Sequence, residues 1–179
     1  MKRCGYIAQN KDIKLLFYYL LNLLMRKINR IVIHCSASNQ DLTAADIVAY
    51  HLRPVNKGGR GWKRPGYHFI VSADGEVTQS VGIENISNGA KGYNSDSIHV
   101  CYIGGIDSFG RATDNRTSIQ KRAMLELLIK LHHQFPTAKI VGHRDLSKDI
   151  NGNGKIDVWE RIKACPCFDA TDEYCSIIS

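Results

Sequence analysis

The sequence predicts an α/β protein, a single domain in which helices flank a mixed central β-sheet. Short β-branched and aromatic runs alternate with helical patterns, as is typical of a sheet covered by helices. Two adjacent runs are joined by Asp74-Gly75, a strong hairpin signal, so at least one strand pair is expected to be antiparallel. The 179 residues are 44% hydrophobic and 23% charged, which is enough to bury a core and excludes a disordered chain.

Five runs of the chain are predicted to form strands. The first, residues 30–36 (RIVIHCS), is rich in β-branched residues and suits a buried strand. The other four span residues 67–72, 76–80, 97–103 and 138–141. These strands give the predicted sheet its edges and its centre.

Two capping patterns predict helices. Thr43 and Asp46 form a partial capping box that opens a helix ending near Leu52, and residues 117–120 (TSIQ) form a full capping box before a long helix. Residues 53–66 hold two prolines and four glycines and are predicted to be a loop, and the C-terminal region a loop followed by one or two short helices. The long helix is expected to face the core with a stripe at helical spacing, formed by Ile119, Ala123, Met124, Leu127, Leu128 and Leu131.

The basic charge is concentrated at the N-terminus. The formal net charge is +7, and residues 1–30, with seven Lys and Arg against one Asp, carry +6 of it. The rest of the chain is nearly neutral, so no nucleic-acid partner is expected.

The N-terminal segment, residues 1–27, is set apart from a domain over residues 28–179. Residues 13–25 (IKLLFYYLLNLLM) are apolar but too short for a stable membrane span. Three interpretations remain open: an uncleaved or poorly cleaved export signal, an amphipathic helix packed on the domain or on a membrane surface, and upstream sequence that is not part of the native protein, with translation starting at Met25. We favour the last, because MRKINRIVIHCSAS runs directly into the first predicted strand.

Histidines and cysteines suggest a metal site. The six cysteines are irregularly spaced, which favours reduced thiols over disulfides. His34 lies at the end of the first strand, His143 follows the last strand and Cys165 lies in KACPCFD. Such residues suit a hydrolytic zinc site with one open position, but a histidine near a strand end is more commonly an ordinary polar residue. Strand alternation allows only one of His34 and Cys35 to face such a site, and we favour His34.

Five motifs favour a zinc site over ordinary polar histidines. IVIHCSAS, GYHFIVSADG, AKGYNSDSIHVCYIGG, VGHRDL and KACPCFD occur in this order between residues 28 and 170. Together they resemble the type-2 N-acetylmuramoyl-L-alanine amidases of the peptidoglycan-recognition family, and most of all the amidase-type phage lysozymes. The resemblance implies zinc-dependent hydrolysis of the amide bond between N-acetylmuramic acid and L-alanine in peptidoglycan.

The resemblance also implies roles for individual residues. His34, His143 and Cys165 would hold Zn²⁺, with Cys167 as a competing third ligand. Tyr67 and Lys163 would be catalytic, as a hydrogen-bond donor or proton relay and as a positive charge. Some relatives carry a glutamate general base on the strand that is here residues 97–103, which contains histidine and cysteine but no acid.

The resemblance implies a peptidoglycan partner and an endolysin or wall-remodelling enzyme, which we expect to be a monomer. Such a protein would be cytoplasmic until its release to the cell wall, or periplasmic or secreted if residues 1–27 are an export signal. The alternative function is a non-catalytic peptidoglycan-binding module.

Residues 149–160 (DINGNGKIDVWE) match the ligand spacing of a calcium-binding loop. Gly154 stands at the sixth position, where such loops turn sharply. An ordinary Asn-Gly-rich turn before a short helix is the alternative. The possible Ca²⁺ ligands are Asp149, Asn151, Asn153, the carbonyl of Lys155, Asp157 and Glu160.

Overall fold

A computed structural model describes residues 26–178 and confirms the predicted mixed sheet flanked by helices. The five strands lie in the order β3-β2-β4-β1-β5. β1 (Arg30–Cys35) pairs in parallel with β4 (Ser97–Tyr102) and with β5 (Lys139–Gly142). β2 (Phe69–Val71) pairs in parallel with β4 and, through the predicted hairpin, antiparallel with β3 (Val77–Gln79).

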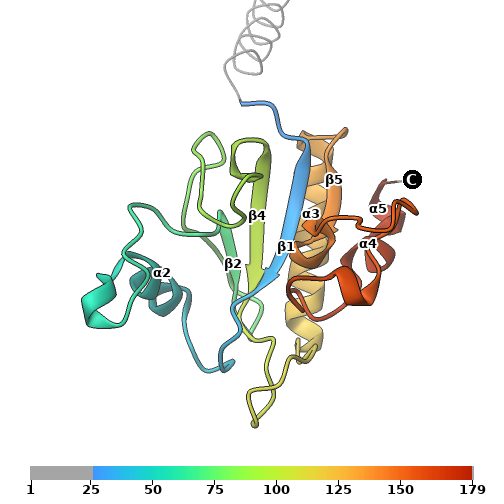
Figure 1. Ribbon diagram of the computed structural model, residues 1–179. Coiled ribbons are helices and arrows are strands. Elements are labelled where there is room, and N and C mark those ends of the chain that lie inside the picture. The colour runs from blue at the N-terminus through green and yellow to red at the C-terminus, as the bar shows by residue number, and fades with distance from the viewer. Residues whose placement is uncertain (1–25, 179) are drawn as a thin grey trace, which may run out of the picture.

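Helices cover both sides of this sheet (Figure 1). α3 (Ser118–Gln134) runs along β1 and β5, with α4 (Ala170–Glu173) and α5 (Cys175–Ile178) beside it, while α2 (Ala44–Leu52) lies beyond β2. Both α2 and α3 begin with complete capping boxes, including the one that the sequence predicted only in part. Four short 3₁₀ turns, η1 to η4, span Val55–Lys57, Asn94–Asp96, His143–Leu146 and Val158–Glu160.

Strand alternation separates two buried faces. On β1, Ile31 and Ile33 belong to the larger core, which includes Met124 and Leu128 of α3. The intervening side chains, including His34, project from the opposite face. A smaller core on that face joins α2 to the sheet through Ala44, Ile47, Ile70 and Ile103.

The inward face of α3 differs from the predicted stripe at one position. Ile119 is 53% exposed, and the core position belongs instead to Gln120, which is fully buried. The Gln120 amide donates to the carbonyls of Val71 (2.9 Å), the last residue of β2, and Ile103 (3.0 Å), the residue after β4. A polar side chain is stable there because both hydrogen bonds are made, a reason that apolar periodicity alone does not reveal.

The N-terminal expectations fall on residues 1–25, outside the described part of the chain. Arg26, the first described residue, lies on the domain, where its guanidinium donates to the carbonyls of Ile83, Asn94, Ser95 and Ser97. Within residues 26–178, no helix is both long enough and apolar enough to cross a membrane.

Candidate active site and metal centre

Three potential metal ligands meet where β1 and β5 end. β1 and β5 are parallel neighbours in which Ile33 pairs with Gly142, so the next residues, His34 and His143, are adjacent. Their ring centroids are 4.6 Å apart. Cys165 arrives from the C-terminal segment, and one ligand atom from each residue lies within 4.8 Å of the others. Among the described residues, no other group of three or more His, Cys, Asp and Glu side chains is placed to hold a metal.

His34 presents one nitrogen to this cluster and the other to the protein interior. Its side chain is buried, with Nδ1 3.8 Å from the Sγ of Cys165 and Nε2 2.9 Å from the Nδ1 of His99. Burial, followed by the nearby charges of His99, His143 and Lys163, holds the pKa of His34 well below its usual value. Burial and Lys163 lower the pKa of His143 to about 4. Both imidazoles are therefore neutral at pH 7, the form that binds metals.

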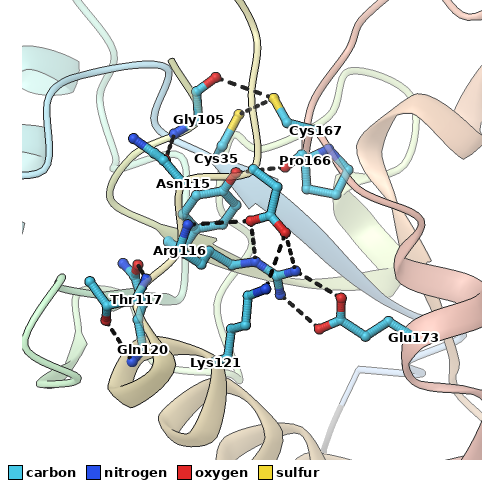
Figure 2. Close-up of polar contacts among 12 residues, drawn as sticks. Cys35, Gly105, Asn115, Arg116, Thr117, Gln120, Lys121, Pro166, Cys167 and Glu173 are labelled. Atoms are coloured by element: carbon cyan, nitrogen blue, oxygen red, sulfur yellow. Dashed lines mark hydrogen bonds and ion pairs between the residues drawn. The ribbon is translucent and has the colours of Figure 1, made fainter. Parts of the chain in front are cut away.

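The backbone around Cys165 is held in place by hydrogen bonds. The carbonyl of Cys165 accepts from the N–H of Arg144 (2.8 Å), and its Sγ accepts from the N–H of Cys35 (3.2 Å). Cys167 turns away, with its Sγ 3.7 Å from the Sγ of Cys35 and its thiol donating to the carbonyl of Gly105 (3.3 Å), as Figure 2 shows. Of the two cysteines left open by the sequence, Cys165 is the one whose sulfur lies beside the histidines.

Arg116 ties the C-terminal segment to the start of α3 (Figure 2). Its side chain donates to the carboxylates of Asp114 and Glu173, at 2.8 Å each, and its guanidinium lies 3.2 Å from the ring centroid of Phe168. Burial opposes the charge, but the hydrogen bonds to the two carboxylates leave the pKa of Arg116 above its usual value. The sequence contained no signal for this clamp, because Glu173, which joins Asp114 on the guanidinium, lies 57 residues away along the chain.

The two predicted catalytic side chains line a pocket of about 220 Å³ together with His143 and Cys165. Tyr67 is half-buried, and its ring centroid lies 5.1 Å from that of His34. Burial, with the neighbouring thiols, raises the pKa of Tyr67 well above its usual value, so the hydroxyl keeps its proton and can donate it. Lys163 is exposed to solvent at the rim, where its charge can reach a bound substrate.

Several aromatic and cationic residues of the pocket lining were missed by sequence reasoning. His51 from α2 stacks on Trp62 with ring centroids 4.8 Å apart, and the guanidinium of Arg60 lies 5.7 Å from the ring centroids of Trp62 and Tyr50. Residues 60 and 62 fall in the segment predicted only as a loop. Aromatic and cationic residues within a glycine-rich stretch were the available signal.

The candidate calcium loop adopts a compact turn without gathering its carboxylates. Asp149 accepts from the backbone N–H groups of Gly152 (2.7 Å) and Gly154 (2.7 Å), and Glu160 accepts from those of Ile150 (2.7 Å) and Asp157 (2.8 Å). These hydrogen bonds account for the fold of the loop without a cation. Calcium binding here stays a prediction.

The family model described as N-acetylmuramoyl-L-alanine amidase matches residues 24–167, most of the chain. The chain belongs to this amidase family. An endolysin of Klebsiella phage KP32 is 34% identical over 141 residues, which are 79% of this chain and 82% of the relative. Among solved structures, the Ph2119 endolysin from a Thermus scotoductus MAT2119 bacteriophage has a TM-score of 0.62 at 25% identity over 86% of each chain. Drosophila PGRP-LB, with a TM-score of 0.60 at 20% identity over 85% of this chain and 82% of its own, shares the fold.

The donor set of this family member suits a zinc ion. Two imidazole nitrogens and one thiolate sulfur are common zinc ligands, and three protein ligands leave a fourth position open. Tetrahedral zinc, with Zn–N near 2.0 Å and Zn–S near 2.3 Å, would require a nitrogen–sulfur distance of about 3.5 Å. The 3.8 Å between His34 Nδ1 and Cys165 Sγ is close to that value.

Proposed function

We propose that this chain is a zinc-dependent N-acetylmuramoyl-L-alanine amidase, which hydrolyses the amide bond between N-acetylmuramic acid and L-alanine in peptidoglycan. The observation that carries the proposal is the convergence of His34, His143 and Cys165 at a pocket that His143 and Cys165 line together with Tyr67 and Lys163. Membership of the amidase family and the endolysin relatives independently support a peptidoglycan hydrolase.

The side chains of the site have separate roles in hydrolysis. His34, His143 and Cys165 would hold zinc, which when bound supplies a Lewis acid and an activated water. The Lys163 ammonium stabilises the negative charge that develops on the carbonyl oxygen, and the neutral Tyr67 hydroxyl donates a hydrogen bond there or relays a proton. The water oxygen bonds to the lactyl carbonyl carbon as the water loses a proton. The carbon–nitrogen bond breaks, and the alanine nitrogen takes up that proton and leaves as an amine.

We place the action of the enzyme at the cell wall, as the endolysin relatives suggest. A module that binds peptidoglycan without cleaving it is the competing function. The presence of a complete ligand set beside Tyr67 and Lys163 supports the enzyme, because binding alone requires none of these groups.

Digestion of purified peptidoglycan tests the proposal. The zinc-loaded protein is expected to lower the turbidity and to release free L-alanine amino termini without new reducing sugars. A chelator should stop the reaction and added zinc should restore it. New reducing ends would identify a glycosidase instead, and binding without cleavage would favour the non-catalytic module.

A pair of cysteine variants makes this test specific to the metal centre. Cys165→Ser is expected to abolish zinc retention and turnover, since it replaces the thiolate that lies beside the histidines. Cys175→Ser makes the same chemical change at an exposed position on α5 and is expected to leave both unchanged. Equal activity in the two variants would contradict the role assigned to Cys165.

A further inference from the structure

His99 lies directly behind the candidate metal ligand His34. It is on β4, where Val32 pairs with His99 and His34 with Cys101, so His34 and His99 are diagonal neighbours on one face of the sheet. Their ring centroids are 5.1 Å apart, and the His34 Nε2 lies 2.9 Å from the His99 Nδ1. His99 is not one of the three converging ligands, so its contact with the metal centre runs through His34 alone.

Stability of the fold does not account for His99. The side chain is completely buried, and among the described residues its Nε2 has no hydrogen-bond partner. An unpaired ring nitrogen in the interior destabilises the folded state, whichever of the two nitrogens carries the hydrogen. An apolar side chain at this position would avoid that penalty, so a role outside folding is indicated.

The hydrogen bond between the two rings has two possible directions. Two neutral imidazoles share a single hydrogen between them. If His99 donates from Nδ1, the hydrogen of His34 must lie on its own Nδ1, which faces Cys165 and then has no lone pair for a metal. If His34 donates from Nε2, its Nδ1 lone pair points at the cluster. Only the second direction is compatible with His34 as a ligand through Nδ1.

We propose that His99 is a positioning residue of the metal centre, which accepts the hydrogen bond from the Nε2–H of His34 and so fixes the tautomer and the orientation of that ligand. Metal-bound histidines are generally oriented in this way by a carboxylate, a carbonyl or a water. Here an imidazole takes that place. The inference rests on the metal site of the proposed function and deepens it.

The ring of His99 is itself held on both sides. His68 stacks against it with centroids 5.8 Å apart and rings 17° from parallel, and the Nδ1 of His68 accepts from the backbone N–H of His99 (2.9 Å). On another side lies Gly89, where any Cβ atom would clash with the Cγ and Nδ1 of His99. The absence of a side chain at residue 89 therefore provides the space that the ring occupies.

Nitrogen-15 NMR of the histidine rings in the zinc-loaded protein reads the tautomer directly. We expect His34 to be metal-bound through Nδ1 and protonated at Nε2, and His99 to be protonated at Nε2 with a bare Nδ1. A His34 hydrogen on Nδ1, or a His99 hydrogen on Nδ1, would overturn the proposal. This measurement uses the unmodified chain, so it does not depend on whether any variant folds.

Zinc affinity, measured by competition with a chromophoric chelator, provides the second test. His99→Leu removes the acceptor and is expected to weaken zinc binding about 10–100-fold, the usual effect of losing such a partner. His99→Asn places an amide oxygen near the position of Nδ1 and is expected to restore the affinity to within about threefold of wild type. An unchanged affinity in a folded His99→Leu variant would refute the role of His99.

His132→Leu is the matched control. It makes the same change at another histidine with a buried ring nitrogen that has no hydrogen-bond partner among the described residues, on α3 and outside the pocket. We expect its zinc affinity to be unchanged, and a loss equal to that of His99→Leu would attribute both effects to general packing. The two proposals can fail separately. If His99→Leu cleaves peptidoglycan and binds zinc as tightly as wild type, the role of His99 is refuted and the amidase function stands. If the unmodified protein binds zinc with the expected histidine tautomers but does not cleave peptidoglycan, the amidase function is refuted and the role of His99 stands.

Discussion

The site is assembled from two regions of different construction. The sheet contributes His34 with its neighbour His99, both buried and both positioned by the register of β1 and β4. The segment after β5, residues 143–174, contributes His143, Lys163 and Cys165. Lys163 and Cys165 lie outside any strand or helix, and all three side chains are more accessible to solvent than His34 and His99. The backbone of the sheet region is fixed by its strand pairing. The C-terminal segment is held by individual side-chain contacts.

This difference indicates a division of tasks. A ligand on a paired strand is oriented with little freedom, whereas groups that must meet a polymeric substrate have to be accessible. The C-terminal segment is kept close to the sheet by a few identifiable contacts, including the Tyr102 hydroxyl on the Pro166 carbonyl (2.7 Å) and the Arg116 clamp. Changes in the two regions should therefore have separable consequences.

The largest expected effect is on catalysis through the C-terminal segment. Lys163→Met should lower kcat by about 10²–10³-fold, since it removes one positive group that stabilises the developing oxyanion. Because Lys163 is exposed, zinc content and melting temperature should stay at wild-type values. The rate of release of L-alanine amino termini measures the effect.

Lys148→Met is the control, because Lys148 is an exposed lysine of the same segment that does not line the pocket. If both variants retained full activity, the exposed cation at the rim would have no part in the reaction. The difference between the two regions would then be one of structure alone.

The next effect concerns the attachment of the C-terminal segment. Arg116→Met should lower the free energy of unfolding by about 2–4 kcal/mol, somewhat less than the loss of a fully buried ion pair because the carboxylate partners are partly solvated. Zinc affinity should fall as well, since Cys165 lies in the segment that Arg116 anchors. Urea unfolding and chelator competition measure the two quantities.

Lys121→Met is matched to this variant, because Lys121 also pairs with Asp114, at 3.5 Å, but is half exposed. Its loss should cost less than about 1 kcal/mol, as is usual for surface ion pairs. A zinc affinity that survives Arg116→Met unchanged would mean that the contacts around Cys165 hold the ligand without the clamp.

Acid should act mainly through the histidines around the sheet. Burial is the largest cause that lowers the pKa of His51 and of His68 to about 4 each, so these rings stay neutral in the folded protein while their unfolded counterparts protonate below about 6.5. The unfolded chain then binds more protons, so the free energy of unfolding should fall as the pH drops from about 6.5 to 4. Each histidine contributes up to about 1.4 kcal/mol per pH unit.

Chemical denaturation of the metal-free protein across this pH range measures the slope. His68→Asn should reduce the pH dependence of the free energy of unfolding by the contribution of one histidine. A slope unchanged by that substitution would show that His68 can protonate within the folded state. Carboxylates with lowered pKa values, such as Asp107, act in a separate window below about 4.

The elements could be predicted from the sequence more fully than the site. Alternation showed that His34 and Cys35 point to opposite faces of the sheet, and the capping box located α3, because both signals are local. The role of His99 required the register of β1 against β4, which joins segments 65 residues apart and has no local signature. Gln120 displaced Ile119 from the core for a similar reason, since its partners are carbonyls at the ends of two other strands.

The smallest expected effect tests whether the C-terminal segment has a stabilising cation of its own. The spacing of residues 149–160 predicts that excess calcium raises the melting temperature by a few degrees, and that equal magnesium does not, because the loop offers more oxygen ligands than magnesium accepts. Asp149→Asn should remove the shift, since the amide keeps one oxygen to accept from Gly152 but lacks the charge that calcium requires. Asp172→Asn, outside the loop, should retain it. Identical melting temperatures in calcium and magnesium would contradict a calcium site. The hydrogen bonds that Asp149 and Glu160 accept from the backbone would then be enough to stabilise the loop that precedes Lys163 and Cys165.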